Sequence, residues 1–158
     1  YTYDANTLYI TKECTPPKLY RYLYNTGVTT LVASGSNPPG LGYPTTMVGR
    51  DGYLYVSSEN EGLYMFRPGV DTKFQEVAPK ANQINYLIVF EGSVFSFLRS
   101  SRLLKWNDVD DWEEAAPTAG GIGDLPFIFG SNLYGAVHSG GMVKIIKWNG
   151  VDSWKFVW

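Results

Sequence analysis

The sequence predicts an all-β fold made of four copies of one structural unit. An aromatic residue holds the same place in each copy, and the separations between Tyr9, Tyr55, Phe95 and Tyr134 are 46, 40 and 39 residues. Such a period is typical of repeat architectures in which each unit is one supersecondary element. The composition agrees, because 16% aromatic residues, 17 glycines and 9 prolines suit short strands joined by tight turns.

The first two copies each contain four short apolar runs, which we interpret as strands because they are too short for ordinary helices. In the first copy, which also has an insertion at 14–17 and a long exit loop, the runs are 1–3, 7–10, 18–23 and 29–33. In the more regular second copy the runs are 45–49, 53–57, 63–67 and 74–78. Gly, Asn, Asp and Pro between the runs predict tight connections.

The third and fourth copies begin with a run that is almost continuously apolar, as expected for a strand that is covered on both faces. The third copy has its runs at 86–90, 93–98, 102–106 and 112–116. The fourth has them at 126–129, 132–137, 143–148 and 154–158. We expect the first run of each copy to be the innermost strand of its unit and the last run to be the outermost.

Four such units predict a single domain that is a β-propeller of four four-stranded antiparallel blades. The expected blades are approximately 1–38, 39–80, 81–118 and 119–158. Each copy runs from inner to outer strand, so no strand is shared between the two ends to lock a ring. Two solutions stay open, because the four blades either close on themselves or form half of a larger propeller that a second chain completes. Closure matters because an uncovered blade face would expose a long apolar surface.

Aspartates recur in the turn between the third and fourth strands. Asp71, Asp110 and Asp152 fall in comparable places. We expect them to be structural, because Asp in a turn can accept hydrogen bonds from nearby backbone N–H groups. The functional alternative is a cation site at Asp108, Asp110 and Asp111, although the spacing lacks the pattern of a calcium loop.

Tryptophans recur across the same turn. Trp106 and Trp112 are six residues apart, and Trp148 and Trp154 repeat that spacing in the next copy. Because the positions follow the period, we expect them to face each other across two strands or to pack between blades. A stacking platform for a sugar ring is the alternative.

The order G-x-LY-x…LY-x-W-N-x-x-x-x-W resembles the repeats of β-propellers, most of all those of the kelch type. The double glycine of kelch repeats has its nearest match in Gly140 and Gly141, which come later in the copy. Hemopexin-like propellers are similar in having four units and in the order DAN…LYI…LYRY, but their closing disulfide needs a second cysteine. Lectin propellers of the tachylectin type are similar in aromatic content. These resemblances imply the fold and no site residues.

Charge and residue content argue against several classes of function. A net charge of -2 offers no basic surface for nucleic acid. No run of 18 apolar residues and no basic, apolar leader is present, so we expect no membrane insertion and no signal peptide. Cys14 and His138 are the only residues of their types, too few for the usual zinc sites, and the sequence has no phosphate-binding glycine motif. We expect no metal and no cofactor.

Function is expected to lie in the loops, because these segments differ most between the copies. Carboxylates, amides, an amine and two aromatic rings in these loops could bind sugar hydroxyls, and the residues that we predict for this are Tyr43, Glu59, Asn60, Glu61, Lys80, Asn82, Asn85 and Tyr86. We therefore expect a non-enzymatic, extracellular recognition module that binds carbohydrate as lectins do.

Other functions stay open. The first is a protein–protein interaction or structural adhesion scaffold, which could belong to a larger protein. A homodimer that completes a larger ring is a further expectation for the case in which the four copies do not close alone. An enzyme that uses Glu59 and Glu61 for acid–base chemistry is the least favoured.

Overall fold

The computed structural model describes residues 2–4, 6–12, 18–34, 44–58, 62–78 and 84–158. Within these ranges all sixteen regular elements are β-strands, which confirms the all-β prediction. The same ranges contain no helix with the length and apolar character needed to span a membrane.

The strands form four four-stranded antiparallel sheets, each made of consecutive strands and here called blades 1 to 4. Blade 1 contains β1 (Thr2–Asp4), β2 (Thr7–Lys12), β3 (Lys18–Leu23) and β4 (Val28–Ser34). Blade 2 contains β5 (Pro44–Arg50), β6 (Tyr53–Ser58), β7 (Leu63–Phe66) and β8 (Gln75–Ala78). Blade 3 contains β9 (Ile84–Phe90), β10 (Ser93–Leu98), β11 (Leu103–Trp106) and β12 (Trp112–Ala116). Blade 4 contains β13 (Ile122–Phe129), β14 (Asn132–Ser139), β15 (Met142–Trp148) and β16 (Trp154–Phe156).

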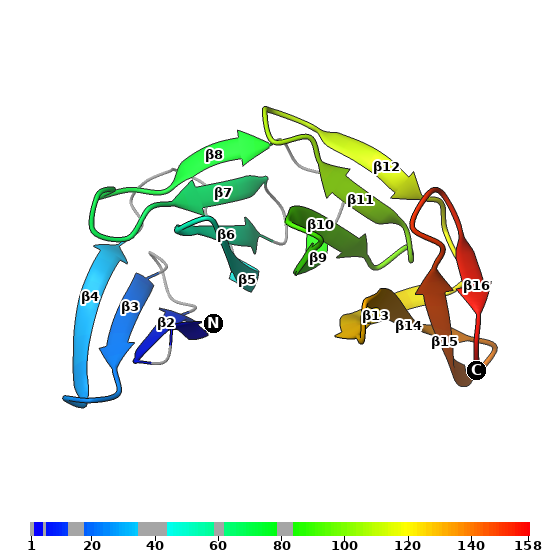
Figure 1. The fold of residues 1–158 in the computed structure, drawn as a ribbon, viewed down its shortest axis with the longest axis horizontal. Helices are drawn as coiled ribbons and strands as arrows, with labels where there is room; N and C mark the ends of the chain where they lie inside the picture. Colours follow the sequence, from blue (N-terminus) through cyan, green and yellow to red (C-terminus); the bar gives the residue numbers. More distant parts are fainter. Residues whose placement is uncertain (1, 5, 13–17, 35–43, 59–61, 79–83) are drawn as a thin grey trace.

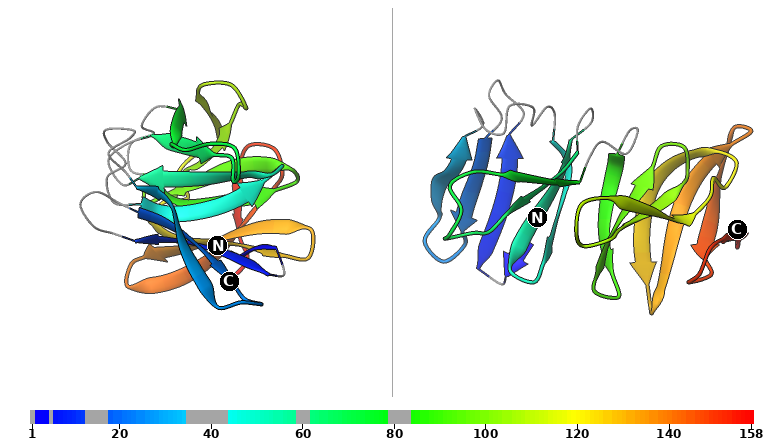
Figure 2. Two further views of the ribbon diagram at one scale, coloured as in Figure 1. Left: turned by 90° about the vertical axis from the view of Figure 1, so that its left-hand side faces the viewer. Right: turned by 90° about the horizontal axis from the view of Figure 1, so that it is seen from above.

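The four blades follow one another along an open arc (Figure 1). The first strands β5, β9 and β13 lie toward its concave side, and the last strands β8, β12 and β16 lie on its convex side. Blades 1 and 4 stand at opposite ends of the row, as the view from above in Figure 2 also shows. The four predicted antiparallel blades are confirmed, and the sheets do not close into a ring.

Tight turns between the first and second strands align equivalent side chains in successive blades. Arg50 pairs with Tyr53, and Phe90 pairs with Ser93, so each turn has two residues. Both turn residues have positive φ, 51° and 81° at Asp51 and Gly52, and 48° and 72° at Glu91 and Gly92. These values are typical of a type I′ turn, which matches the twist of the strands that it joins. The register that results places equivalent side chains on the same face of each blade.

Three hydrophobic cores hold the arc together, one in each seam between successive blades. The core of seam 1–2 contains Tyr9, Leu19, Leu54, Val56, Tyr64, Phe66 and Phe74. The core of seam 2–3 contains Tyr55, Leu63, Ala78, Leu87, Val94, Leu98, Leu104 and Trp106. The core of seam 3–4 contains Phe90, Phe95, Phe97, Leu103, Ala115, Ala116, Leu133, Val137 and Ile146. Each inner blade therefore buries one face against the blade before it and the other against the blade after it.

The predicted tryptophan pairs lie in these seams. Trp106 is the direct cross-strand partner of Trp112, and Trp148 is that of Trp154. Trp106 also lies across seam 2–3 from Tyr55, with 5.2 Å between the ring centroids. Both expected forms of packing, across two strands and between blades, are confirmed.

Phe97 in β10 packs blade 3 against blade 4. Its side chain is completely buried, and its ring lies 5.5 Å from that of Trp154 in an edge-on arrangement. A Cβ atom at Gly135 would lie 2.9 Å from Cζ of this ring, which is closer than real contacts allow. The missing side chain at position 135 thus makes room for the phenyl group.

Truncation of this ring should destabilise the protein. Removal of a buried phenyl group leaves a cavity, so we expect Phe97→Ala to lower the free energy of unfolding by about 3–5 kcal/mol, measured by urea denaturation. Phe156→Ala is the matched control, because Phe156 is 59% exposed. The centroid of its ring lies 5.4 Å from Nζ of Lys144. This control variant should lose about 1 kcal/mol or less. Equal losses in the two variants would contradict the assignment of Phe97 to the seam core.

Candidate functional site

Most of the predicted binding residues lie outside the described part of the chain. These are Tyr43, Glu59, Asn60, Glu61, Lys80 and Asn82. Asn85 is described only through its backbone in β9. Of the eight residues, Tyr86 alone has a described side chain.

Tyr86 contacts the neighbouring blade through a carboxylate. Its hydroxyl donates a hydrogen bond to Oδ1 of Asp124 at 3.5 Å, and Nε2 of His138 lies 3.1 Å from Oδ2 of the same group. Asp124 lies in β13 and His138 in β14, so this contact joins the innermost strand of blade 3 to the first two strands of blade 4. The Tyr86 hydroxyl thus links two blades, and its ring is half-buried.

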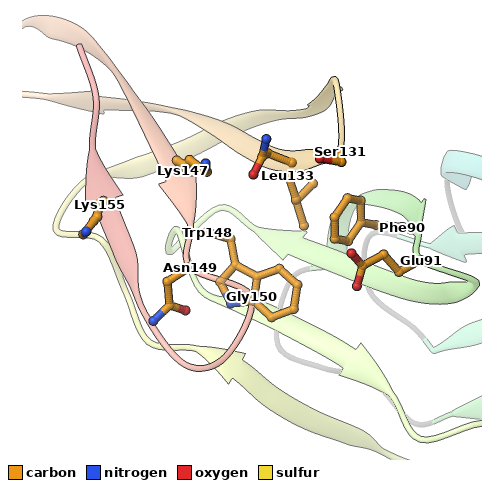
Figure 3. Close-up of a pocket in the computed structure, with 10 residues that line it drawn as sticks. Phe90, Glu91, Ser131, Leu133, Lys147, Trp148, Asn149, Gly150 and Lys155 are labelled. Carbon is orange, nitrogen blue, oxygen red and sulfur yellow. The ribbon is translucent and has the colours of Figure 1, made fainter.

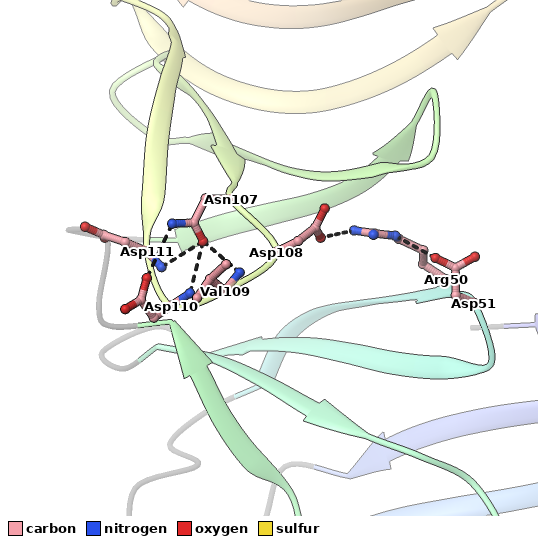
Figure 4. Close-up of polar contacts among 7 residues, drawn as sticks. All are labelled: Arg50, Asp51, Asn107, Asp108, Val109, Asp110 and Asp111. Atoms are coloured by element: carbon pink, nitrogen blue, oxygen red, sulfur yellow. Dashed lines mark hydrogen bonds and ion pairs between the residues drawn. The ribbon is translucent and has the colours of Figure 1, made fainter.

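Arg50 closes one edge of seam 2–3 (Figure 4). Its guanidinium carbon lies 5.8 Å from the centroid of the Trp106 ring, and the group forms ion pairs with Asp108 and, at 3.0 Å, with Asp51. The hydrogen bond that Arg50 donates to the Asp108 carboxylate raises the pKa of Arg50 above its ordinary value, so the guanidinium group stays charged. The Arg50 side chain is only 16% exposed, so the cation held over the indole ring occupies this edge.

An asparagine organises the turn that follows β11, and another organises the turn that follows β15. Oδ1 of Asn107 accepts hydrogen bonds from the backbone N–H groups of residues 109–111 at 2.9–3.1 Å. Oδ1 of Asn149 accepts the same three bonds from residues 151–153. Asp110 and Asp152 each accept a hydrogen bond from the side-chain amide of that asparagine. The structural role predicted for these two aspartates is confirmed, with an asparagine at the centre of each turn.

The other two carboxylates of the turn after β11 also have partners within the protein. Asp108 pairs with Arg50, and Oδ1 of Asp111 accepts a hydrogen bond from the N–H of Trp112 at 2.7 Å. Across the described residues, no three His, Cys, Asp or Glu side chains are grouped so that they could hold a metal ion. The acidic turn is thus accounted for by hydrogen bonds within the fold.

The equivalent edge of seam 3–4 is hollow. The two asparagine turns align Trp148 with Trp106 and Gly150 with Asp108, and the two-residue turns align Phe90 with Arg50. Both partners of the Arg50–Asp108 ion pair are therefore replaced. A pocket of about 410 Å³, here called the blade 3–4 pocket, occupies this edge, and its lining includes Phe90, Glu91, Ser131, Asn132, Trp148 and Gly150 (Figure 3).

The blade 3–4 pocket combines an aromatic wall with hydrogen-bonding groups. Phe90 and Trp148 meet edge-on with 6.1 Å between their centroids, and Figure 3 shows the Glu91 side chain directed toward Trp148. Ser131 and Asn132, at the start of β14, add a hydroxyl and an amide to the lining. Such a site can pack an apolar ring face while it donates and accepts hydrogen bonds along the edge of the same ligand.

The indole nitrogens of the seams do not by themselves mark a ligand site. Nε1 is buried in Trp106, Trp148 and Trp154, and none of the three has a hydrogen-bond partner among the described atoms. Because Trp106 belongs to the seam that Arg50 closes, this feature is common to filled and hollow seams. The residues exchanged around Trp148 distinguish the blade 3–4 pocket from the equivalent edge of seam 2–3, whereas a buried indole N–H is common to both seams.

Sequence analysis missed the blade 3–4 pocket, because it assigned function to the loops that vary most. A signal was nevertheless present in the aligned copies. Phe90 stands where the preceding copy has Arg50, and Gly150 stands where it has Asp108. The meaning of that exchange became visible only when both positions were seen to face one tryptophan.

Comparison with known proteins supports the fold class. No protein-family description matches the chain, and neither does any curated protein. Among solved structures, the chain is similar to the computationally designed Ika8 protein, with a TM-score of 0.62 over 96% of this chain at 10% identity. It is also similar to the N-terminal domain of Nup159, with a TM-score of 0.58 over 98% of this chain at 11% identity.

The chain covers 46% of each of these two structures, so it spans about half of their length. Both are β-propellers, and at 10–11% identity the similarity concerns the fold alone. Together with the four antiparallel sheets, it shows that the chain is built of β-propeller blades.

Proposed function

We propose that this protein is a non-enzymatic recognition module that binds carbohydrate, and that the blade 3–4 pocket is one of its binding sites. The supporting observation is the exchange of Arg50 and Asp108 for Phe90 and Gly150 at equivalent places in successive seams. The exchange leaves space beside Trp148 in an otherwise repeated structure. Its volume of about 410 Å³ falls in the range of small-molecule sites.

The chemistry of the lining favours a sugar over other small ligands. A sugar ring has an apolar face, which Trp148 could cover, and hydroxyl groups along its edge, which both donate and accept hydrogen bonds. Asn132 and Ser131 supply both functions, and the Glu91 carboxylate accepts from hydroxyl donors. The lining also contains Lys147 and Lys155, whose ammonium groups can donate hydrogen bonds to hydroxyl oxygens.

The loop residues predicted from sequence form a separate part of this proposal. Tyr86 lies near the start of β9, whereas Phe90 and Glu91 lie at its end. Tyr86, the predicted residue with a described side chain, and the blade 3–4 pocket are therefore at opposite ends of β9. Variants at one end can be tested without disturbance of the other.

A protein-interaction or structural adhesion scaffold is the second candidate function. It is supported by exposed apolar side chains at both ends of the arc, among them Ile10 and Leu31 in blade 1 and Ile122 and Phe129 in blade 4. We also propose that the blades are of the kelch type, on the basis of the spacing of the LY and W residues. The lectin interpretation leads us to propose an extracellular location.

Carbohydrate binding should be detectable directly. We expect the purified chain to bind at least one class of glycan on a glycan array, with titration calorimetry of the best ligand as confirmation. The physical reason is the pairing of an aromatic wall with mixed donors and acceptors in one pocket. An array without any binding would refute the lectin proposal and leave the scaffold function.

Filling the pocket should abolish that binding. The double variant Phe90→Arg/Gly150→Asp transfers the ion pair of seam 2–3 into seam 3–4, so we expect the affinity for the glycan to fall at least about tenfold. The fold should tolerate the change, because Gly150 has a φ of 85° and its counterpart Asp108 already adopts 67°. Affinity is measured by calorimetry, and retention of the fold by circular dichroism.

Asp108→Gly provides the matched control for this graft. It removes one carboxylate from the neighbouring seam, away from the blade 3–4 pocket, and should leave glycan affinity unchanged. Full glycan affinity in the graft variant would exclude the blade 3–4 pocket as the site and leave the loop residues predicted from sequence.

A further inference from the structure

Each seam of the arc uses the same position of the repeat. Tyr9, Tyr55 and Phe95 are only 3%, 4% and 3% exposed, and each belongs to the core that its blade shares with the next one. Tyr55 lies 5.2 Å from Trp106 of the following blade, and Phe95 lies 5.2 Å from Trp148. The repeat therefore prescribes an aromatic contact from every blade to the blade that follows.

Blade 4 carries the first half of such a contact without a following blade. Tyr134 holds the repeated position, is half-buried, and stacks on Phe127 of its own sheet at 5.4 Å. Phe129 corresponds in register to Arg50 and Phe90, both of which lie against a tryptophan of the next blade, yet Phe129 is 73% exposed. This face of blade 4, here called the trailing face, therefore has the composition of a seam.

Blade 1 carries the second half without a preceding blade. The register of its strands places Leu8, Ile10, Tyr20 and Tyr22 at the positions of Leu54, Val56, Tyr64 and Phe66 in blade 2. Those four residues of blade 2 are 0–2% exposed in seam 1–2, whereas Ile10 is 42% exposed. This face of blade 1, here called the leading face, is apolar at each seam position.

Tyr22 is the leading-face residue that would pack against a trailing face. It corresponds to Phe66 in blade 2, to Trp106 in blade 3 and to Trp148 in blade 4, each of which contacts the blade before it or contributes to that core. In blade 1 the ring of Tyr22 is half-buried and meets only Tyr24 edge-on at 5.2 Å among the described ring contacts. Tyr22 therefore matches the place opposite Tyr134 and Phe129.

We propose that two copies of this chain associate head to tail, with the trailing face of each against the leading face of the other. The product is a closed ring of eight blades with a two-fold axis and two identical new seams. In each seam, Tyr22 of one copy packs beside Phe129 and Tyr134 of the other. A ring of this kind covers both free faces at once, which a face-to-face pair through blade 4 alone would not do.

One observation favours a second copy as the occupant. The chain spans about half the length of the propellers that it resembles, so two copies supply a ring of their size. The trailing face carries two lysines that pair across β15 and β16, Lys147 and Lys155, whereas the equivalent positions of blade 3 hold Lys105 and Glu113. The inference uses other residues than the carbohydrate proposal, apart from Lys147 and Lys155, which line the blade 3–4 pocket and also lie on the trailing face.

The mass of the chain in solution tests the ring. We expect analytical ultracentrifugation to give twice the chain mass of 17.7 kDa, about 35 kDa, without further growth as the concentration rises. A monomer would overturn the proposal. Continued growth in mass would also overturn it, because it would indicate an open head-to-tail array.

Single variants then identify the two faces. Phe129→Lys alters the trailing face at an exposed position, and Tyr22→Asp alters the leading face. Each places a charge in both seams, so each variant alone should sediment as a folded monomer, with folding checked by circular dichroism. A Tyr22→Asp dimer would overturn the head-to-tail arrangement, because it would show pairing that does not use blade 1.

The mixture of the two variants gives a result that misfolding cannot imitate. One seam of the mixed dimer is wild-type, and the other sets the introduced ammonium group opposite the introduced carboxylate. We therefore expect an equimolar mixture to recover the 35 kDa species, at about twice the chain mass. Failure of the mixture to dimerise while both variants are folded would overturn the proposal. Val109→Lys, at a position 71% exposed on a turn of blade 3, is the control and should remain dimeric.

Discussion

The packing of one blade against the next is the constraint on which the rest of this structure depends. A four-stranded sheet with apolar side chains on both faces cannot bury them alone, so each blade is stable only through its neighbours. The three cores meet this need for the inner faces of the row, with Tyr9, Tyr55 and Phe95 at the same place in each. The two outer faces keep the residues of a seam, and no blade in the described part of the chain covers them.

Departures from the repeat account for the difference between two equivalent seams. Seams 2–3 and 3–4 share a tryptophan, an asparagine turn and a two-residue turn, and they differ in the pair Arg50 and Asp108 against Phe90 and Gly150. A filled edge and a hollow edge thus arise on one scaffold by two side-chain changes. Because the surrounding backbone is common to both, the hollow reflects the exchanged residues.

The sequence predicted the strands and the tryptophan pairs because both depend on local spacing. Strand runs bounded by Gly, Asn and Asp, and tryptophans six residues apart across a turn, follow from hairpin geometry. The role of Asn107 was not predicted, since Asp and Asn in a turn have similar propensities and only the bond directions showed which side chain accepts three N–H groups. The blade 3–4 pocket was missed because its walls come from two blades, and sequence spacing gives no distance between them.

The sequence by itself determined an all-β repeat of four antiparallel units, because the alternation of apolar and turn residues is a property of each short segment. Whether those units close, which faces stay open and where a cavity forms were decided only by the tertiary structure. These outcomes depend on how sheets pack across the seams, through contacts such as Arg50 to Asp108, whose residues lie 58 apart in the chain. The repeat period showed that blades would stack, and the arrangement of the stacked blades showed that each end of the row carries a face with seam residues.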